Sequence, residues 1–508
     1  MAKHCTRSCL KKHVIIWSLV LIGLNTNGTK PLHARDCIKL TLDSAVDIAM
    51  GSSYRIKQLE LGIERTRYWL KSRQASLKSR VYMNLQSPVI NSISEKKWNS
   101  TLKKDEIVHE NTRRWQMDLA VRQPVIFFGY PTNGYLSLNN QVYQYIQKDG
   151  TEDIDYYNRF FLKFEQPFFL PNNLKNDIED AELDLQRSEL EYIADRVKLI
   201  DDIADDYYDL YEVVYKDNIY KHQVENLEKI AELAAGIARQ DEARAIESVQ
   251  VQVELANARE MLLKNNSEIR REAVRIKQRL RLNHEDSVYI EPKVKITPIS
   301  VDADQAIEYG LALRPRLRML TIDKRKNEID LNNSRGWDAF HINLEMTYGL
   351  ERQEKRFEEI WDDYDKSYSV SLNAYIPIWD WGRRKAQIQA QKMTLEKTEL
   401  YFEENRNNIR SDIINAVYNL DEFQKRALNM QESLKMVQEI SDFGMNQYRD
   451  KAISLQDLLQ MITRQKETEL NFLDAYVGYR RGLLSLMIQT YYDYENRVSL
   501  IDKFQAES

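Results

Sequence analysis

Residues 368–391, YSVSLNAYIPIWDWGRRKAQIQAQ, contain the two kinds of structure from which the rest of the chain is built. Apolar side chains occupy every second position from Tyr368 to Ile376, and polar side chains lie between them. This period of two predicts a strand with one apolar and one polar face. A Pro, two Trp and Gly382 follow, and a long helical pattern then begins. The passage therefore predicts a strand that leads directly into a helix.

The same alternation predicts strands in four other segments, and aromatic residues gather near strand ends. These segments are 80–86, 115–122, 160–168 and 341–348. Strands of this kind resemble those of outer-membrane barrels, although a half-buried soluble sheet has the same pattern. We count two clear strands in each half and an extra hairpin around 134–145, which gives four to six strands. That is too few to close a barrel, and lipid does not tolerate an open sheet edge, so several chains are expected to share one barrel.

Two long segments carry heptad patterns and almost no helix breakers. From Asn172 to Arg239, Leu183, Leu190 and Val197 begin a series of apolar residues seven apart. Segment 383–449 repeats the pattern, and 246–282 and 455–491 are predicted as return helices. At about 1.5 Å per residue, each long helix would extend roughly 100 Å. Alone, these helices would equally fit a coiled-coil rod.

The chain also repeats itself. Residues 45–74 align without gaps on 306–335, and later matches have an offset of 210 rather than 261, so the first half has about 50 more residues. We therefore expect a first helix-strand-strand-helix repeat at 35–290 and a second at 291–508. The extra residues fall among the first-half strands. Segment 91–114 is polar, as expected of an extracellular loop, and 129–150 could form a hairpin.

The N-terminus has the pattern of an export signal. Lys3 and Arg7 are among four basic residues that precede the apolar run Val14 to Leu24, and Ala34 is a suitable last residue before cleavage. This predicts a signal peptide at 1–34 and a mature chain outside the cytoplasm. Whether Cys37 carries a lipid is left open.

Composition argues against several functions. The net charge of −5 gives no basic patch for nucleic acid. The mean hydropathy of −0.59 does not fit a bundle of membrane-spanning helices. Of three Cys, two lie in the leader, and the seven His have no metal-ligand spacing. No catalytic motif is present, so we predict no enzyme activity, no catalytic residue, no metal and no cofactor.

Several motifs, in the same order in both halves, resemble the TolC family of outer-membrane efflux proteins. LTLDSAVDIAM (40–50) and VDADQAIEYGL (301–311) resemble the opening of each repeat in that family. QPFFLPNNLKNDIEDAE (166–182) and YIPIWDWGRRKAQIQAQ (375–391) resemble its junction between strand and helix. Segment 448–486 resembles the periplasmic tip and return helix.

The resemblance implies an α+β fold. The implied assembly is a trimeric outer-membrane β-barrel with about four strands per chain, continued by a long periplasmic α-helical coiled-coil barrel. Each chain of such an assembly is expected to consist of two internal repeats. It also implies a passive exit duct of a tripartite efflux or secretion system. The expected partners are two further copies, a periplasmic adaptor, an inner-membrane pump or ABC exporter, and outer-membrane lipid. The alternative is a soluble or surface-tethered coiled-coil interaction protein.

The resemblance also implies candidate sites at the periplasmic end. Asp457 matches the first of two acidic positions at the pore constriction of the family, whereas Gln460 stands at the second and Ser248 at the corresponding position of the first repeat. The alternative for Asp457 is an ordinary solvated residue. The adaptor is expected to contact the two tip turns, which are Gln240, Asp241 and Glu242, and Asp450, Lys451 and Ala452.

Overall fold

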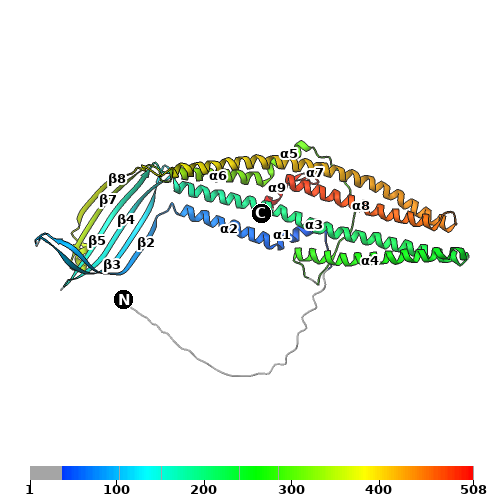
Figure 1. Ribbon diagram of the computed structural model, residues 1–508, viewed down its shortest axis with the longest axis horizontal. Coiled ribbons are helices and arrows are strands. Elements are labelled where there is room, and N and C mark those ends of the chain that lie inside the picture. The colour runs from blue at the N-terminus through cyan, green and yellow to red at the C-terminus, as the bar shows by residue number, and fades with distance from the viewer. Residues whose placement is uncertain (1–36, 102, 150, 240, 284, 507–508) are drawn as a thin grey trace, which may run out of the picture.

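A computed structural model places a β-sheet at one end of the molecule and a long array of helices at the other (Figure 1). It describes residues 37–506 except 102, 150, 240 and 284. The expected signal peptide therefore lies outside the described residues. Among the described residues, no helix is both long enough and apolar enough to cross a membrane.

The order of elements occurs twice along the chain. In both halves two helices precede strands, and a long helix and a return helix follow them. The first half contains α1 (Leu42–Ser52), α2 (Tyr54–Ala75), β2 (Arg80–Asn99), β3 (Lys104–Phe127), β4 (Tyr130–Asp149), β5 (Thr151–Phe168), α3 (Asn173–Ala238), η1 (Glu242–Arg244) and α4 (Ala245–Leu280). The second half contains α5 (Ala303–Leu313), α6 (Pro315–Gly336), β7 (His341–Glu354), η2 (Phe357–Trp361), β8 (Asp365–Tyr375), α7 (Arg383–Arg449) and α8 (Leu455–Thr490). The division into repeats at 35–290 and 291–508 stays a proposal, which this order supports.

The large sheet has six antiparallel strands in the order β2-β3-β4-β5-β7-β8. The mixture of helices and sheet agrees with the expected α+β class. Six strands lie within the four to six counted from the sequence and exceed the four or so that the resemblance implies. The additional strands come from the first half, where the proposed hairpin at 129–150 contributes β4. Segment 91–114 is not a loop: residues 91–99 continue β2, and 104–114 begin β3.

The long helices form as the heptad pattern predicts. The helix α3 begins after Asn172, whose side chain accepts a hydrogen bond from the backbone N–H of Lys175. The helix α7 begins after Gly382, which adopts the left-handed conformation with a φ of 82°. With 66 and 67 residues, both helices run most of the length of the helical part.

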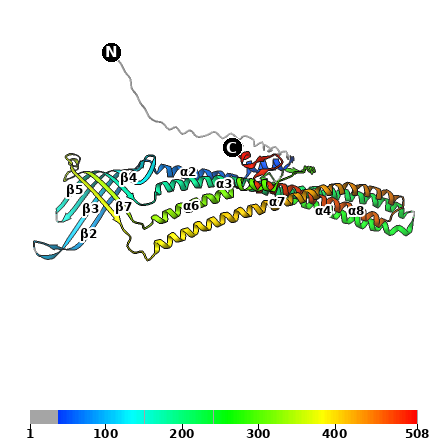
Figure 2. The ribbon, with the colours of Figure 1, turned by 90° about the horizontal axis from the view of Figure 1, so that it is seen from above.

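The helices form a curved wall rather than a closed bundle. The helix α3 packs on both α4 and α8, and α8 packs on α7, so the order across the wall is α4-α3-α8-α7. Figure 2 shows that the helices spread apart near the sheet and come together toward the far tip. The two outermost helices of this order are α4 and α7, which touch each other at the tip, where Tyr448 of α7 contacts Glu247 of α4.

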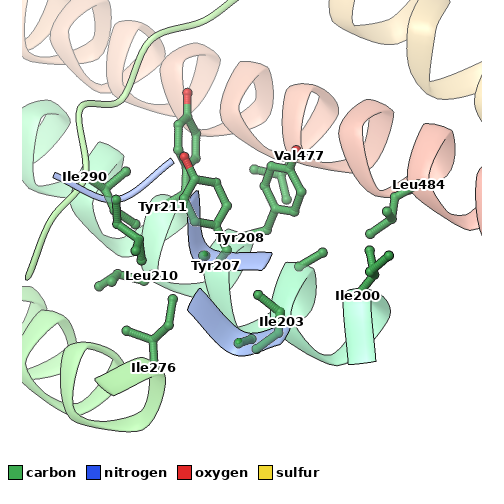
Figure 3. Close-up of a cluster of buried hydrophobic side chains, with 14 of the residues drawn as sticks. Ile200, Ile203, Tyr207, Tyr208, Leu210, Tyr211, Ile276, Ile290, Val477 and Leu484 are labelled. Atoms are coloured by element: carbon green, nitrogen blue, oxygen red, sulfur yellow. The ribbon is translucent and has the colours of Figure 1, made fainter. Parts of the chain in front are cut away.

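A core in the middle of the wall joins the two halves (Figure 3). Ile203 and Tyr211 of α3 pack there with Ile276 of α4 and Val477 of α8. The hydroxyl group of Tyr211 donates to the backbone oxygen of Lys293 at 3.2 Å. Short elements surround this core: β1 (Cys37–Lys39) pairs in parallel with β6 (Ser287–Tyr289), and β9 (Tyr492–Asp493), β10 (Val498–Ser499) and α9 (Leu500–Ala506) complete the C-terminal region.

Candidate pore, outer surface and tip

One face of the sheet carries apolar side chains on all six strands. Because paired residues share a face, the registers define a row that crosses the whole sheet. Except for Val121, the residues of this row expose 45% to 83% of their surface. The row consists of Val81, Val121, Leu138, Leu162, Tyr348 and Tyr368. An exposed apolar surface of this extent is unfavourable in water and suits contact with lipid. We call it the apolar face.

The opposite face, which we call the polar face, carries charged and hydrogen-bonding groups. The Nζ atom of Lys163 lies 2.6 Å from a carboxylate oxygen of Glu165 and 3.2 Å from one of Glu345. The guanidinium group of Arg114 lies over the ring of Tyr143, 4.3 Å from its centroid. Ion pairs and cation–π contacts stabilise the charged side chains of this face. A face that carries such charged groups suits the lining of an aqueous lumen.

Exposed aromatic residues mark the end of the sheet that joins the helices. Phe128, Phe169 and Trp381 follow β3, β5 and β8, and each exposes more than 70% of its surface. All three have a positive φ, between 48° and 69°. This conformation is unfavourable for a bulky side chain, so the turn must hold it in place. Aromatic rings at this level are typical of the border between lipid and water.

Near the far end of the sheet, the connection between β7 and β8 covers part of the apolar face. Asn158 is completely buried there. Its amide nitrogen donates to the backbone oxygen of Ile360 at 3.2 Å and to the hydroxyl group of Tyr364 at 3.1 Å. The buried amide therefore has partners, as a polar group away from water requires.

Asp457 lies in the first turn of α8, next to the tip. The hydroxyl group of Ser454 donates to its Oδ2 at 2.7 Å, and the backbone N–H of Ser454 donates to the same oxygen at 3.2 Å. The backbone N–H of Asp457 donates in return to the Ser454 hydroxyl group. This reciprocal arrangement is a capping box, which stabilises the beginning of a helix. The side chain thus has a local structural role in addition to any role in the pore.

Among the described residues, no hydrogen bond or ion pair joins the three constriction candidates to one another. Gln460 is exposed on α8, one turn beyond Asp457, and Ser248 is half-buried on α4. Among the candidate tip residues, Asp241, Glu242, Asp450, Lys451 and Ala452 are exposed, whereas Gln240 lies outside the described residues. These assignments therefore stay proposals that concern an assembly of several chains.

The sequence did not predict a contact between the end of α7 and the beginning of α4, which lie at the tip. Tyr448 of α7 is fully buried, and its hydroxyl group donates to Oε2 of Glu247 on α4 at 2.9 Å. Arg244 donates to the other carboxylate oxygen at 2.8 Å. Burial, together with the hydrogen bond to Glu247, raises the pKa of Tyr448 to about 12. In the sequence, the only signal is a tyrosine within the polar stretch 446–451, which does not reveal a partner 201 residues away.

These features define a class of fold: an antiparallel sheet with one apolar and one polar face, continued by a long wall of helices. The fold is shared with solved outer-membrane channels. CusC gives a TM-score of 0.65 at 13% identity, over 89% of this chain and 92% of CusC. CmeC from Campylobacter jejuni gives 0.64 at 13% identity, over 96% and 97%. The open state of MtrE from Neisseria gonorrhoeae gives 0.59 at 14% identity, over 88% of each chain.

The family model described as outer membrane efflux protein matches residues 324–486. This match confirms the resemblance to TolC-family outer-membrane efflux proteins and the expected location in the outer membrane, with the helices extending into the periplasm. It also supports a role as a channel, and the family and the similar structures are channels rather than enzymes. No curated protein sequence gives a match to this chain.

Proposed function

We propose that three copies of this chain form a passive exit duct of a tripartite efflux or secretion system. The main support is a pair of exposed apolar stripes on α4 and α7, the helices at the two sides of the wall. Near the tip, α4 and α7 each expose an apolar stripe at helical spacing, and its residues expose 51% to 73% of their surface. The stripes are Ile246, Val249 and Val253 on α4, and Met436, Ile440 and Phe443 on α7.

The two stripes lie at similar heights. The bond between Tyr448 and Glu247 holds the end of α7 beside the beginning of α4, and both stripes lie within about four turns of that point. A second copy that places its α7 against the α4 of the first would bury both. Repetition of this contact in one rotational sense closes a ring, and a ring of three encloses a lumen.

The direction of the duct follows from its two ends. The apolar face places the sheet in the outer membrane, and the helices then reach into the periplasm. There the exposed tip turns are the natural contact for an adaptor, which would join the duct to a pump or exporter that supplies the energy. An apolar face of this size would be costly in water, which argues against the alternative of a soluble coiled-coil protein.

Disulfide formation between copies tests the ring. In a background with Cys37→Ser, the pair Val249→Cys and Ile440→Cys should give dimers and trimers under oxidation of intact envelopes. In the control pair, Glu254→Cys lies one residue after Val253 on α4 and Glu439→Cys lies one residue before Ile440 on α7. Each is turned about 100° around its helix from that stripe residue and should give monomers. Monomers with the first pair, or equal crosslinking with both, would contradict the proposed ring.

Adaptor contact is tested at the tip turn. A photo-crosslinking amino acid at Lys451 should capture a periplasmic protein that carries an inner-membrane anchor. The same amino acid at Ser100, at the opposite end of the molecule, should not capture it. Capture at both positions, or at neither, would contradict adaptor binding at the tip.

A further inference from the structure

The sheet has two more strands than the four that the resemblance implies, and all six strands form one continuous ladder. The pairing of β3 with β4 is continuous from Thr112–Gln147 to Phe127–Tyr130, apart from one irregularity near Pro124. The pairing of β4 with β5 then extends from Tyr135–Glu165 to Asp149–Thr151. The apolar row crosses all six strands without a change of face. Removal of β2 and β3 from the sheet would break this ladder and leave the edge of β4 open.

The outer edges of β2 and β8 do not pair with another strand in the described part of the chain. Both carry apolar residues that face outward, with Met83 and Leu85 on β2 and Val370 and Leu372 on β8, all between 54% and 69% exposed. Unpaired backbone groups at these edges would be costly in lipid. Because the sheet has an even number of alternating strands, β2 and β8 run in opposite directions and can pair as an antiparallel ladder.

We propose that β8 of one copy pairs with β2 of the next, so that three copies close a barrel of eighteen strands, six from each chain. This inference rests on the proposed trimer. The resemblance implies a barrel of twelve strands, four from each chain. The expected number is larger here because the first half of this chain contributes four strands, which extend the apolar face. The occupant of each open edge is therefore a second copy of this chain.

The number of strands sets the width of the barrel. With strands about 4.8 Å apart and tilted by about 40°, eighteen strands give a backbone diameter of roughly 36 Å, against roughly 24 Å for twelve. After about 5 Å of side chain on each wall, the lumen would be about 25 Å wide, which is the regime of open porin channels. A pair of packed helices, roughly 20 Å across, fits such an exit. The outer-membrane end would thus admit partly folded polypeptide, and selection of cargo by size would lie at the helical end.

Cysteine pairs on the polar face test the number of strands in the envelope. In the Cys37→Ser background, Ala120→Cys with Asn139→Cys lie opposite each other on β3 and β4 and should form a disulfide within one chain. Ser369→Cys on β8, combined in turn with cysteine at Tyr82, Asn84 or Gln86 on β2, should link neighbouring copies in at least one register. Ser369→Cys combined with cysteine at Ser137, Asn139 or Gln141 on β4 should not.

The outcomes separate this inference from the proposed trimer. A link between β8 and β4, or no link from β8 to β2 in any register, overturns the eighteen-stranded barrel when the helical pair at Val249 and Ile440 still gives trimers. Loss of the helical crosslink as well overturns the trimer itself, and the barrel with it. If Ala120→Cys and Asn139→Cys do not form a disulfide, β3 is not paired with β4 in the membrane, and this result also overturns the inference.

Discussion

Two side chains at the tip, Asp457 and Tyr448, differ in how far the sequence reveals their roles. The sequence identifies Asp457 through a resemblance, but it does not show that Ser454 already binds the carboxylate. Tyr448 has the more definite role, because it joins two segments that lie far apart in the chain. Both residues stand next to the expected entrance of the duct.

Replacement of Asp457 with Asn should reduce the cation preference of the channel. Three carboxylates around a narrow mouth would raise the local cation concentration, and their removal should weaken both cation preference and block by divalent cations in a planar bilayer. The amide can still accept a hydrogen bond from Ser454, so the cost in stability should be below about 0.5 kcal/mol. Ser454→Ala, which removes the cap but keeps the charge, is the matched control. Unchanged selectivity in Asp457→Asn would place this residue outside the pore.

Replacement of Tyr448 with Phe should loosen the tip. The lost hydrogen bond to a charged acceptor is worth about 1.5–3 kcal/mol. Hydrogen–deuterium exchange should therefore increase around residues 244–250 and 445–455. Tyr418→Phe, a change at an exposed position on α7, should leave exchange at the tip as it is. Equal protection in Tyr448→Phe and the unmodified protein would show that the bond does not hold the tips together.

The same bond predicts a dependence on pH. Because the pKa of Tyr448 is raised from 10 to about 12 in the folded protein, the neutral phenol is the form that the fold favours. Its contribution is complete below pH 10 and is lost as the pH rises through about 12. Protection of the tip should fall over that interval and should do so less in Tyr448→Phe. A tip whose protection falls equally in both proteins would contradict this assignment.

At the scale of the element, the two faces of each strand should respond differently to charge. Val370→Arg places a guanidinium group on the apolar face and should destabilise the inserted protein by about 2–4 kcal/mol if that position lies near the middle of the bilayer. Ser371→Arg, on the polar face of the same strand, should have little effect. Heat-induced loss of the assembled form on gels measures the difference. Equal losses would contradict the assignment of the faces.

The sequence predicts the helices more completely than the strands. Heptad spacing predicts α3, α4, α7 and α8 to within about two residues at each end, because one packed face imposes a period along the whole length. The strands are longer than predicted because residues 91–99 and 104–111 pair mainly with each other and have no apolar face. In this part of the hairpin the sequence has no alternation of apolar and polar residues, and Lys96 and Asp105 form a cross-strand ion pair at 2.8 Å. Backbone pairing, which no side-chain period reveals, builds that part of the hairpin.

For the whole molecule, the orientation in the membrane can be tested directly. The tip of the hairpin between β2 and β3 lies at the end opposite the helices, so cysteine at Ser100 should react with an impermeant reagent in intact cells (Figure 1). Cysteine at Lys451 should react only after the outer membrane is opened. Both variants need the Cys37→Ser background. The reverse pattern of labelling would invert the proposed topology.

The central claim is that several copies of an open wall enclose one duct. Electron cryomicroscopy of the mature protein, extracted from the outer membrane and held in a lipid disc, tests it most directly. We expect three chains around a continuous lumen, with the apolar faces toward lipid, the polar faces inward, and α4 of each chain against α7 of the next. A single chain in the disc, or three chains without a lumen between them, would contradict it.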